Sequence, residues 1–364
     1  MSTEDFLDWY WRRPLASQGQ PPSHLSTLER SLHPQQCGVC HPRQFVGWQK
    51  SRHAQAMGAG VIGQLLNLSS AESQECLNCH APLQEQAMSW TTHLPDHLSQ
   101  QGVLCGACHV RNYQWFGPPP RAPLSSSQQA HSRWQTQNAF TDSRFCAACH
   151  QFPKEGYTLN GKLLENTYQE WQNSPSAQQQ KSCQSCHMPD RQHLWRGIHD
   201  VEMVRSGVTI RLSDLLFTKN MLHISLVLQN THTGHFFPTY VTPKVVMQIY
   251  QEDETGHLIT ETLQEVVIAR EVSLDLDREY FDTRLAPNEV ASLKYCQIRH
   301  VEAKNLVVNI QVYPDAFYTR FYQNLLAGGK LTTEAISFIK KALLESEQSK
   351  LSLYYKRLIL PFSG

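Results

Sequence analysis

The chain has no long apolar run and no excess of charge of either sign. No stretch of its 364 residues approaches the roughly 20 apolar residues that span a bilayer. The 32 basic and 32 acidic residues balance, so nothing suggests a nucleic-acid partner. The first twenty residues include Asp5, Asp8, Arg12 and Arg13 and have no apolar core of signal-peptide length. These absences predict a protein without a transmembrane span, peripheral to a membrane at most.

Cysteine is scarce outside one repeated motif. All of the 11 cysteines except Cys296 belong to Cys-x-x-Cys-His, which occurs at Cys37–His41, Cys76–His80, Cys105–His109, Cys146–His150 and Cys183–His187. Since only 18 of 364 residues are His, a His after every pair has a chance probability of about 10⁻⁷. Zinc sites need no His at that position, and a disulfide scaffold is shorter and richer in cysteine. Cys296 is expected to be a buried strand residue.

Cys-x-x-Cys-His is the attachment signature of a c-type haem. The two thiols form thioethers to the porphyrin, and the His is the proximal ligand of the iron. The sequence therefore predicts five covalently bound haem c groups. The predicted attachment residues are Cys37, Cys40, Cys76, Cys79, Cys105, Cys108, Cys146, Cys149, Cys183 and Cys186. The predicted proximal ligands are His41, His80, His109, His150 and His187.

Haem attachment has consequences for location and charge. Covalent attachment of haem c takes place outside the cytoplasm, so we expect a periplasmic or extracellular protein whose export leader is not present in this chain. The haem propionates need cationic partners. The candidates are Arg43, Arg52, Arg111, Arg133, Arg144, Arg191 and Arg196.

Composition and periodicity divide the chain into four predicted regions. Residues 1–36 are expected to form an arm that prolines keep from becoming a long helix. Residues 37–204 contain every motif and are predicted to wrap five haems in short helices and irregular loops. Residues 205–313 alternate with a period of two, which indicates an immunoglobulin-like β-sandwich. Residues 314–364 are predicted to be C-terminal helices. The expected fold class is α+β.

An electron-carrying haem usually has a second axial ligand. The five proximal histidines leave thirteen others, so bis-His ligation is favoured over Met. His131 is the natural candidate before the fourth motif. Between the second and third motifs, His97 is favoured over His93 as a ligand. His193, after the fifth motif, is a further open candidate.

Several segments carry a resemblance. Trp48–Ala54, which follows the first motif, is similar to the W-x-x-S-x-H-A segment after the first haem site of multihaem cytochromes. That superfamily includes the tetrahaem electron carrier of ammonia oxidisers and hydroxylamine oxidoreductase. Gly197–Asp200 and the loop Thr233–Thr239 look like later segments of the same proteins. The resemblance covers residues 37–240 well and implies that His53, His199 and His235 are distal ligands. This chain has five motifs, whereas the small carrier has four haems. The haem arrangement of that carrier is therefore not assumed for this chain.

Electron transfer between periplasmic or extracellular redox partners is the predicted function. One alternative is an enzyme with an open iron site that acts on nitrite, hydroxylamine, nitric oxide or a sulfur oxyanion. Another is a subunit of a haem filament, in which His24 and His33 could ligate a neighbour's iron. The expected partners are redox proteins, with self-association or a membrane-bound redox complex as further options. The number of axial ligands that one chain supplies to each haem separates the three alternatives.

Overall fold

The computed structural model describes residues 2–87, 97–121, 131 and 134–361, and only the backbone of His97. These residues form two compact units, each assembled from separate stretches of sequence. The first comprises Met1–His150, Lys181–Arg196 and Leu325–Ala342, and the second comprises Gln151–Gln180, Gly197–Asn324 and Leu343–Gly364. The sequence suggests consecutive domains, whereas the observed units interleave along the chain.

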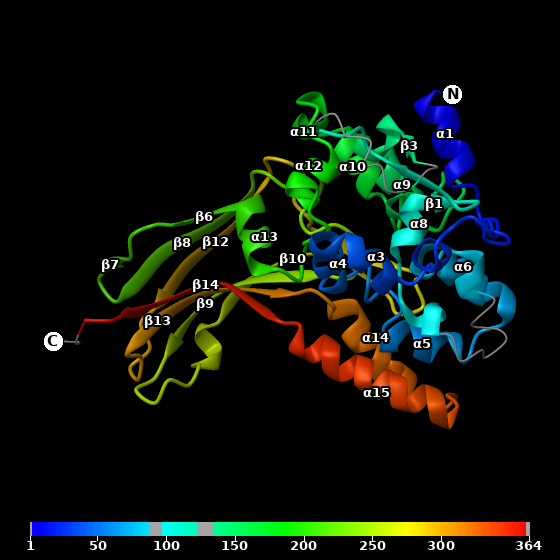
Figure 1. The fold of residues 1–364 in the computed structure, drawn as a ribbon. Coiled ribbons are helices and arrows are strands. Elements are labelled where there is room, and N and C mark those ends of the chain that lie inside the picture. Colours follow the sequence, from blue (N-terminus) through cyan, green and yellow to red (C-terminus); the bar gives the residue numbers. More distant parts are fainter. Residues whose placement is uncertain (1, 88–96, 122–130, 132–133, 362–364) are drawn as a thin grey trace. The chain divides into compact units, whose positions relative to one another are not determined.

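Short helices make up most of the first unit (Figure 1). They are α1 (Thr3–Tyr10), α2 (Thr27–Arg30), α3 (Pro34–Cys40), α4 (Pro42–Gln49), α5 (Ala59–Leu65), α6 (Ser70–His80), α8 (Cys105–His109), α9 (Arg144–His150) and α12 (Cys183–His187), with the 3-10 helices η1 (His97–Gln100), η3 (Asn138–Thr141) and η4 (Pro189–Arg191). A small sheet contains β1 (Val110–Arg111), β2 (Gln114–Gly117) and β3 (Gln135–Thr136). Serine capping boxes begin α1, α2 and α6, and proline occupies the first turn of α3 and α4.

The N-terminal segment is a packed part of the first unit. In the capping box of α1, Ser2 accepts from the backbone N–H of Asp5 at 3.1 Å, and Asp5 accepts from the backbone N–H of Ser2 at 3.2 Å. Phe6, Leu7 and Tyr10 are buried in a cluster with Phe116, Ala139 and Phe140. The predicted arm therefore contains a helix that ends before its first proline, at Pro14.

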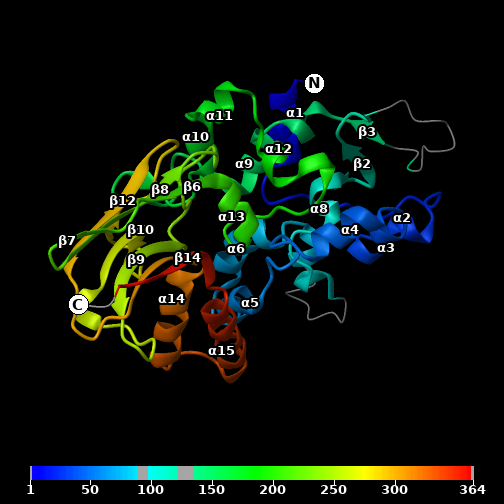
Figure 2. The same cartoon turned by 90° about the vertical axis from the view of Figure 1, so that its left-hand side faces the viewer.

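Two antiparallel sheets form most of the second unit (Figures 1 and 2). The first has the order β11-β10-β9-β13-β14, and the second has the order β12-β8-β6 with β7 also paired to β8. Their bounds are β6 (Val208–Leu212), β7 (Leu216–Thr218), β8 (Met221–Asn230), β9 (Lys244–Glu252), β10 (Gln264–Val272), β11 (Glu279–Asp282), β12 (Val290–Ile298), β13 (Asn305–Tyr313) and β14 (Leu351–Ile359). The hairpin of β4 (Thr158–Leu159) and β5 (Lys162–Leu163) precedes them. The remaining helices of this unit are α10 (Thr167–Gln172), α11 (Pro175–Gln178), α13 (Val201–Gly207) and η5 (Thr260–Thr262). Helices α14 (Ala316–Ala327) and α15 (Thr333–Gln348) are each divided between the two units.

The two sheets share one apolar core. Alternate residues of β8, from Leu222 to Leu228, are buried against Met247 and Ile249 of β9 and Ile310 of β13. Each such side chain stabilises the fold by about 1.5–3 kcal/mol. The two-residue period predicted from the sequence is thus observed as a β-sandwich, and its immunoglobulin-like character stays a prediction.

Two expectations for the second half of the chain differ from the structure. The C-terminal region is not wholly helical, because β14 returns to pair with β13 through eight residue pairs. Cys296 lies in strand β12 as expected, but its side chain is exposed rather than buried. In the described part of the chain, no helix has the length and apolar composition needed to cross a bilayer.

Candidate functional site

Each Cys-x-x-Cys-His motif lies on a short helix of the first unit. The motif is at the end of α3, α6 and α9, and it forms the whole of α8 and α12. A single helical turn brings the two sulfurs to one side and the next imidazole beneath them. None of these cysteines is in a disulfide, so both sulfurs of each motif are available for thioethers.

Cysteines from different motifs lie side by side. Cys105 donates a hydrogen bond to Cys37, which lowers the pKa of the Cys37 thiol. Cys146 donates in the same way to Cys183 and lowers its pKa to about 7. A hydrogen bond from Cys149 likewise lowers the pKa of Cys79, to about 6. The structure therefore places the first motif beside the third, the second beside the fourth, and the fourth beside the fifth.

Arg13 links the second and fourth motifs, a role that the sequence analysis did not assign. Its guanidinium donates to Cys79 Sγ at 3.4 Å and to Cys149 Sγ at 2.8 Å. The chain between α1 and α2 thus contacts two attachment turns at once. Arg13 is far from both cysteines in sequence, so only the folded chain brings its guanidinium to these sulfurs.

Three proximal histidines share one hydrogen-bond pattern. Nδ1 of His80 donates to the carbonyl of Ala56 at 2.6 Å. Nδ1 of His109 donates to Phe116 O at 2.8 Å, and Nδ1 of His187 donates to Arg196 O at 2.7 Å. Because a carbonyl only accepts, Nδ1 carries the proton in each ring and Nε2 is the nitrogen suited to a metal.

Three pairs of imidazole rings lie at nearly the same spacing. The ring centroids of His41 and His131 are 6.0 Å apart, and those of His109 and His193 are 6.1 Å apart. The centroids of His53 and His150 are 6.2 Å apart. Two collinear metal–nitrogen bonds of about 2 Å, with about 1.1 Å from each nitrogen to its ring centre, separate two axial imidazoles by about 6 Å. The spacing of the pairs therefore fits an iron atom between the rings.

The pair of His109 and His193 has the most complete surroundings. Nδ1 of His193 donates to the carbonyl of Arg191 at 3.1 Å, so both rings have Nδ1 held by backbone. Burial lowers the pKa of His109 to about 4 and also lowers the pKa of His193. Both imidazoles are therefore neutral at physiological pH, which is the form that binds iron.

His53 is held by the segment that resembles multihaem cytochromes. Helix α4 ends at Gln49, so His53 lies in a turn. The hydroxyl of Ser51 donates to the carbonyl of Trp48 at 2.7 Å and accepts from the N–H of Ala54 at 3.3 Å. Burial, together with the nearby His150, lowers the pKa of His53 to about 3.

His131 pairs with the first motif. Its ring lies on Trp115, with centroids 4.8 Å apart and an angle of 14° between the planes. Nδ1 is 3.7 Å from a carboxylate oxygen of Glu29. The ring of His131 is stacked on Trp115 and faces His41, while its Nδ1 has no hydrogen-bond partner among the described residues.

His235 belongs to the second unit and lies in a loop that a buried carboxylate holds. Its Nδ1 donates to the carbonyl of Phe236 at 2.8 Å, and burial lowers its pKa. Gly234 has a φ of +65° there, and a Cβ on it would lie 3.0 Å from Ser176 Oγ. Glu170 accepts from the N–H of Phe236 at 3.2 Å and from Arg284 Nη1 at 2.9 Å.

The other predicted ligands have different positions. Nε2 of His199, the nitrogen expected to bind iron, is 2.9 Å from a carboxylate oxygen of Asp315. His93 and the side chain of His97 lie outside the described part of the chain. Among the described side chains, no imidazole faces His80 at the spacing of the three pairs.

Arg111, a predicted propionate partner, is a buried cation beside the third motif. Its Nε donates to Tyr10 O at 3.0 Å, and its Nη1 donates to the carbonyls of Ala107 at 3.0 Å and Val110 at 2.7 Å. Its Nη2 is buried without a hydrogen-bond partner. A buried guanidinium with an unused N–H fits a carboxylate ligand, such as a propionate.

The outcome for the other candidate arginines is mixed. Arg144 donates to the carboxylate of Asp142 at 2.7 Å, and Arg191 donates to the carbonyl of Pro119 at 2.6 Å. Arg133 lies outside the described residues.

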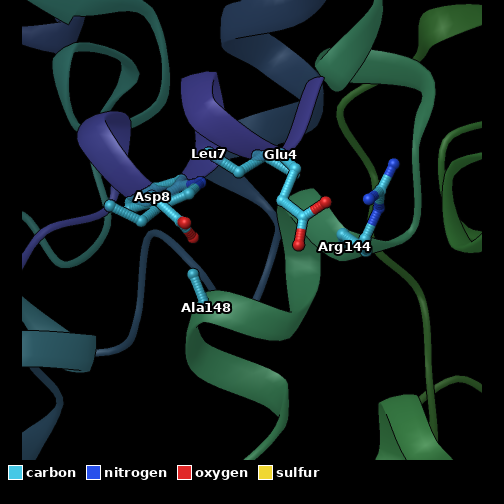
Figure 3. A pocket seen from close by; sticks show the side chains of 6 residues that line it. Glu4, Leu7, Asp8, Arg144 and Ala148 are labelled. Atoms are coloured by element: carbon cyan, nitrogen blue, oxygen red, sulfur yellow. The ribbon is translucent and has the colours of Figure 1, made fainter. Parts of the chain in front are cut away.

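A pocket of about 260 Å³ lies between α1 and α9 (Figure 3). Figure 3 shows Glu4 and Asp8 from α1 opposite Arg144 and Ala148 from α9. Trp11 also lines it, and its indole N–H is buried without a partner. Ala148 lies within the fourth motif, so the pocket borders an attachment turn with a polar, partly acidic wall.

The fold and the site together have the features of a multihaem c-type cytochrome, and comparisons with known proteins agree. Residues 36–110 match the family model described as "Cytochrome c554 and c-prime". A penta-heme cytochrome c552 from Thermochromatium tepidum superposes with a TM-score of 0.64 and 18% sequence identity, covering 92% of this chain and 100% of that one. The fold of this chain is therefore the fold of that cytochrome.

The other comparisons add little. A solved structure described as Northeast Structural Genomics Consortium target SoR45 matches with a TM-score of 0.18 and 8% identity, over 43% of this chain and 90% of that one. That likeness is too slight to support an argument. Comparison with curated proteins finds no match.

Proposed function

We propose that this chain is a pentahaem c-type cytochrome that carries electrons between redox partners outside the cytoplasm. The observation that carries the proposal is the spacing of 6.0–6.2 Å between three pairs of imidazoles, each containing the His of one Cys-x-x-Cys-His motif. The cysteine pairs, the protonated Nδ1 atoms and the unsatisfied N–H of Arg111 support it.

The proposed axial pairs are His41 with His131, His150 with His53, and His109 with His193. His199, which the resemblance implied as a distal ligand, is not among these pairs, because Asp315 holds its Nε2. His235 remains a proposed ligand, since its tautomer and burial suit one. The second ligand of the haem at His80 remains a prediction, with His97 as the candidate.

Closed ligation suits electron transfer rather than catalysis. Haem c, when bound, supplies an iron that cycles between Fe(II) and Fe(III). The two cysteines of each motif would hold the haem through thioethers, and the paired imidazoles would bind its iron. Because burial lowers the pKa of His53, His109 and His193, these imidazoles would need no proton exchange when the charge of the iron changes. Adjacent motifs, such as those of Cys79 and Cys149, would place neighbouring groups close enough for rapid transfer.

The location and partners follow from the same proposal. Since attachment of haem c takes place outside the cytoplasm, we propose a periplasmic or extracellular protein that meets soluble or membrane-bound redox proteins. Carriers of this kind dock through their charged rims, so electron exchange with a partner should weaken as salt rises.

Carbon monoxide binding to the reduced protein tests closed ligation. The proposal predicts slow, substoichiometric binding, because both axial positions of the three paired sites are taken. His193→Ala is the positive control, since it opens one site and should create one haem per chain that binds carbon monoxide promptly. Prompt binding by one haem in the unsubstituted protein would support the enzyme alternative. Prompt binding that appears only on dilution would support a filament, in which a neighbour completes the site.

A further inference from the structure

The indole of Trp195 lies between two of the imidazoles that the proposed function assigns to iron. Its ring centroid is 4.7 Å from that of His53, with 81° between the planes. It is 4.9 Å from the centroid of His193, with 84° between the planes. Both contacts are edge-to-face, the arrangement that aromatic rings prefer. One side chain therefore contacts the proposed distal ligands of the third and fourth motifs.

The backbone at Trp195 is tied to the fifth motif. The N–H of Trp195 donates to the carbonyl of His187 at 3.1 Å. In return, Nδ1 of His187 donates to the carbonyl of Arg196 at 2.7 Å. Trp195 also has a φ of +41°, in the left-handed region. A non-glycine residue is strained in that region, so the surrounding contacts must hold it in place.

The side chain of Trp195 rests on the same framework as His53. The indole packs against a buried cluster that contains Trp48 and Leu104. Trp48 Nε1 donates to the carbonyl of Val103 at 2.7 Å, and the N–H of Val103 donates to the carbonyl of His53 at 2.8 Å. The indole and the His53 backbone are therefore fixed to one cluster, which limits how either moves alone.

The chain at His193 is fixed just as closely. A Cβ on Gly47, in helix α4, would lie 3.0 Å from the carbonyl oxygen of His193 and 3.3 Å from its nitrogen. The backbone of His193 thus lies directly on α4, beside Trp48. Because His193 and Trp195 are two residues apart on this short segment, the ring of each restricts the side-chain conformations of the other.

We propose that Trp195 is a positioning residue shared by the haem sites of the third and fourth motifs. Its ring edge fixes the orientation of the imidazoles of His53 and His193, and its backbone links that orientation to His187. This inference rests on the proposed function, since it needs iron between the paired rings. A change at Trp195 should therefore alter two haems together and leave the haem of the first motif unchanged.

Substitution of Trp195, followed by electron paramagnetic resonance of the oxidised protein, tests the proposal. In Trp195→Leu the two distal imidazoles lose their edge-to-face partner and rotate, so two low-spin signals should shift in g value. The intact mass should still show every haem in place, because no cysteine has changed. Trp195→Phe keeps an aromatic ring, so its signals should lie closer to those of the unsubstituted protein.

Matched variants identify the signals and control for general effects. His53→Ala and His193→Ala each turn one low-spin signal into a high-spin one and so mark the fourth and third haems. Trp9→Leu removes a half-exposed indole of the same unit, whose ring contacts are with Phe6, Tyr10 and Phe116, and should shift nothing. Trp115→Leu should shift the haem of the first motif instead, through His131.

The outcomes separate this inference from the proposed function. If Trp195→Leu leaves both marked signals in place, shifts only one of them, or shifts all signals alike, the shared positioning role is wrong. Should Trp195→Leu not fold, the same criteria apply to Trp195→Met, which also lacks an aromatic ring. An unsubstituted protein without low-spin haem signals would overturn the proposed function itself.

Discussion

The imidazole rings of His53 and His150 face each other with centroids 6.2 Å apart and 60° between their planes. His53 follows the first motif, yet it meets the His of the fourth. His131, which precedes the fourth motif, meets the His of the first. The proposed distal ligands are thus exchanged between motifs, so position along the chain does not predict which haem a given His would serve.

The angles between paired rings predict an order of magnetic anisotropy. They are 23° for His41 with His131, 33° for His109 with His193, and 60° for His53 with His150. Parallel imidazoles split the iron d orbitals, whereas crossed imidazoles leave them nearly degenerate and raise the largest g value. Of these three haems, the one whose low-spin signal disappears in His53→Ala should have the largest g value. If that signal has the smallest g value of the three, the observed ring geometry is not that of the haem-loaded protein.

A methyl group at Gly47 should disturb the third haem. A Cβ there would lie 3.0 Å from the carbonyl oxygen and 3.2 Å from the carbonyl carbon of His193, so the segment has to move by a few tenths of an ångström. We expect Gly47→Ala to lower the free energy of unfolding by about 1–3 kcal/mol and to shift the signal marked by His193→Ala. Gly197→Ala is the matched control, because nothing lies within 4 Å of its Cβ position. Identical spectra and stabilities for the two variants would contradict the close approach of His193 to α4.

The second unit should lose stability in acid through Asp282. Burial alone would raise the pKa of this carboxyl, but hydrogen bonds from Arg284 and Lys162 outweigh it and hold the pKa at about 2, below the ordinary 3.8. The stabilisation is therefore complete above about pH 4 and is lost as pH falls toward 2. We expect a loss of about 1–2 kcal/mol between pH 5 and pH 2.5, measured by chemical denaturation at each pH.

The control for this pH dependence is a substitution that removes the titrating group. Asp282→Asn should be less stable than the unsubstituted protein at pH 5, with a smaller difference at pH 2.5. Asp214→Asn, at an exposed carboxyl, should leave the pH dependence unchanged. Parallel stability curves for the unsubstituted protein and Asp282→Asn would show that the ion pairs of Asp282 do not contribute.

Local signals in the sequence predicted local structure well. The alternation of apolar residues in β8 and β13 indicated strands, because each strand buries one face in the sandwich. Strand β14 lacks that alternation because it is an edge strand. Leu353 is its one buried residue, and Tyr355, Lys356 and Arg357 are exposed. Helix α1 did have a sequence signal, the Ser2–Asp5 capping box before Phe6 and Tyr10. The prediction of an arm gave more weight to the prolines that follow.

The candidate site divides in the same way between local and long-range features. The motif at Cys105–His109 can be predicted from the spacing of its residues alone, because one helical turn sets its geometry. His193 stayed one of several open candidates and Trp195 had no signal, because their contacts with His109 and His53 depend on how distant segments pack. Arg13 is a similar case, since its contact with Cys149 joins residues far apart in the chain.

The central claim of this account is that the five motifs carry five covalent haems. Intact mass spectrometry of the denatured, reduced protein tests it most directly, because thioether bonds survive denaturation whereas axial ligation does not. The mass should exceed that of the 41.7 kDa polypeptide by five haem masses of roughly 0.6 kDa each. A thiol reagent should then modify one residue, the exposed Cys296. A mass equal to that of the polypeptide, or one with fewer than five haems and correspondingly more free thiols, would contradict the claim.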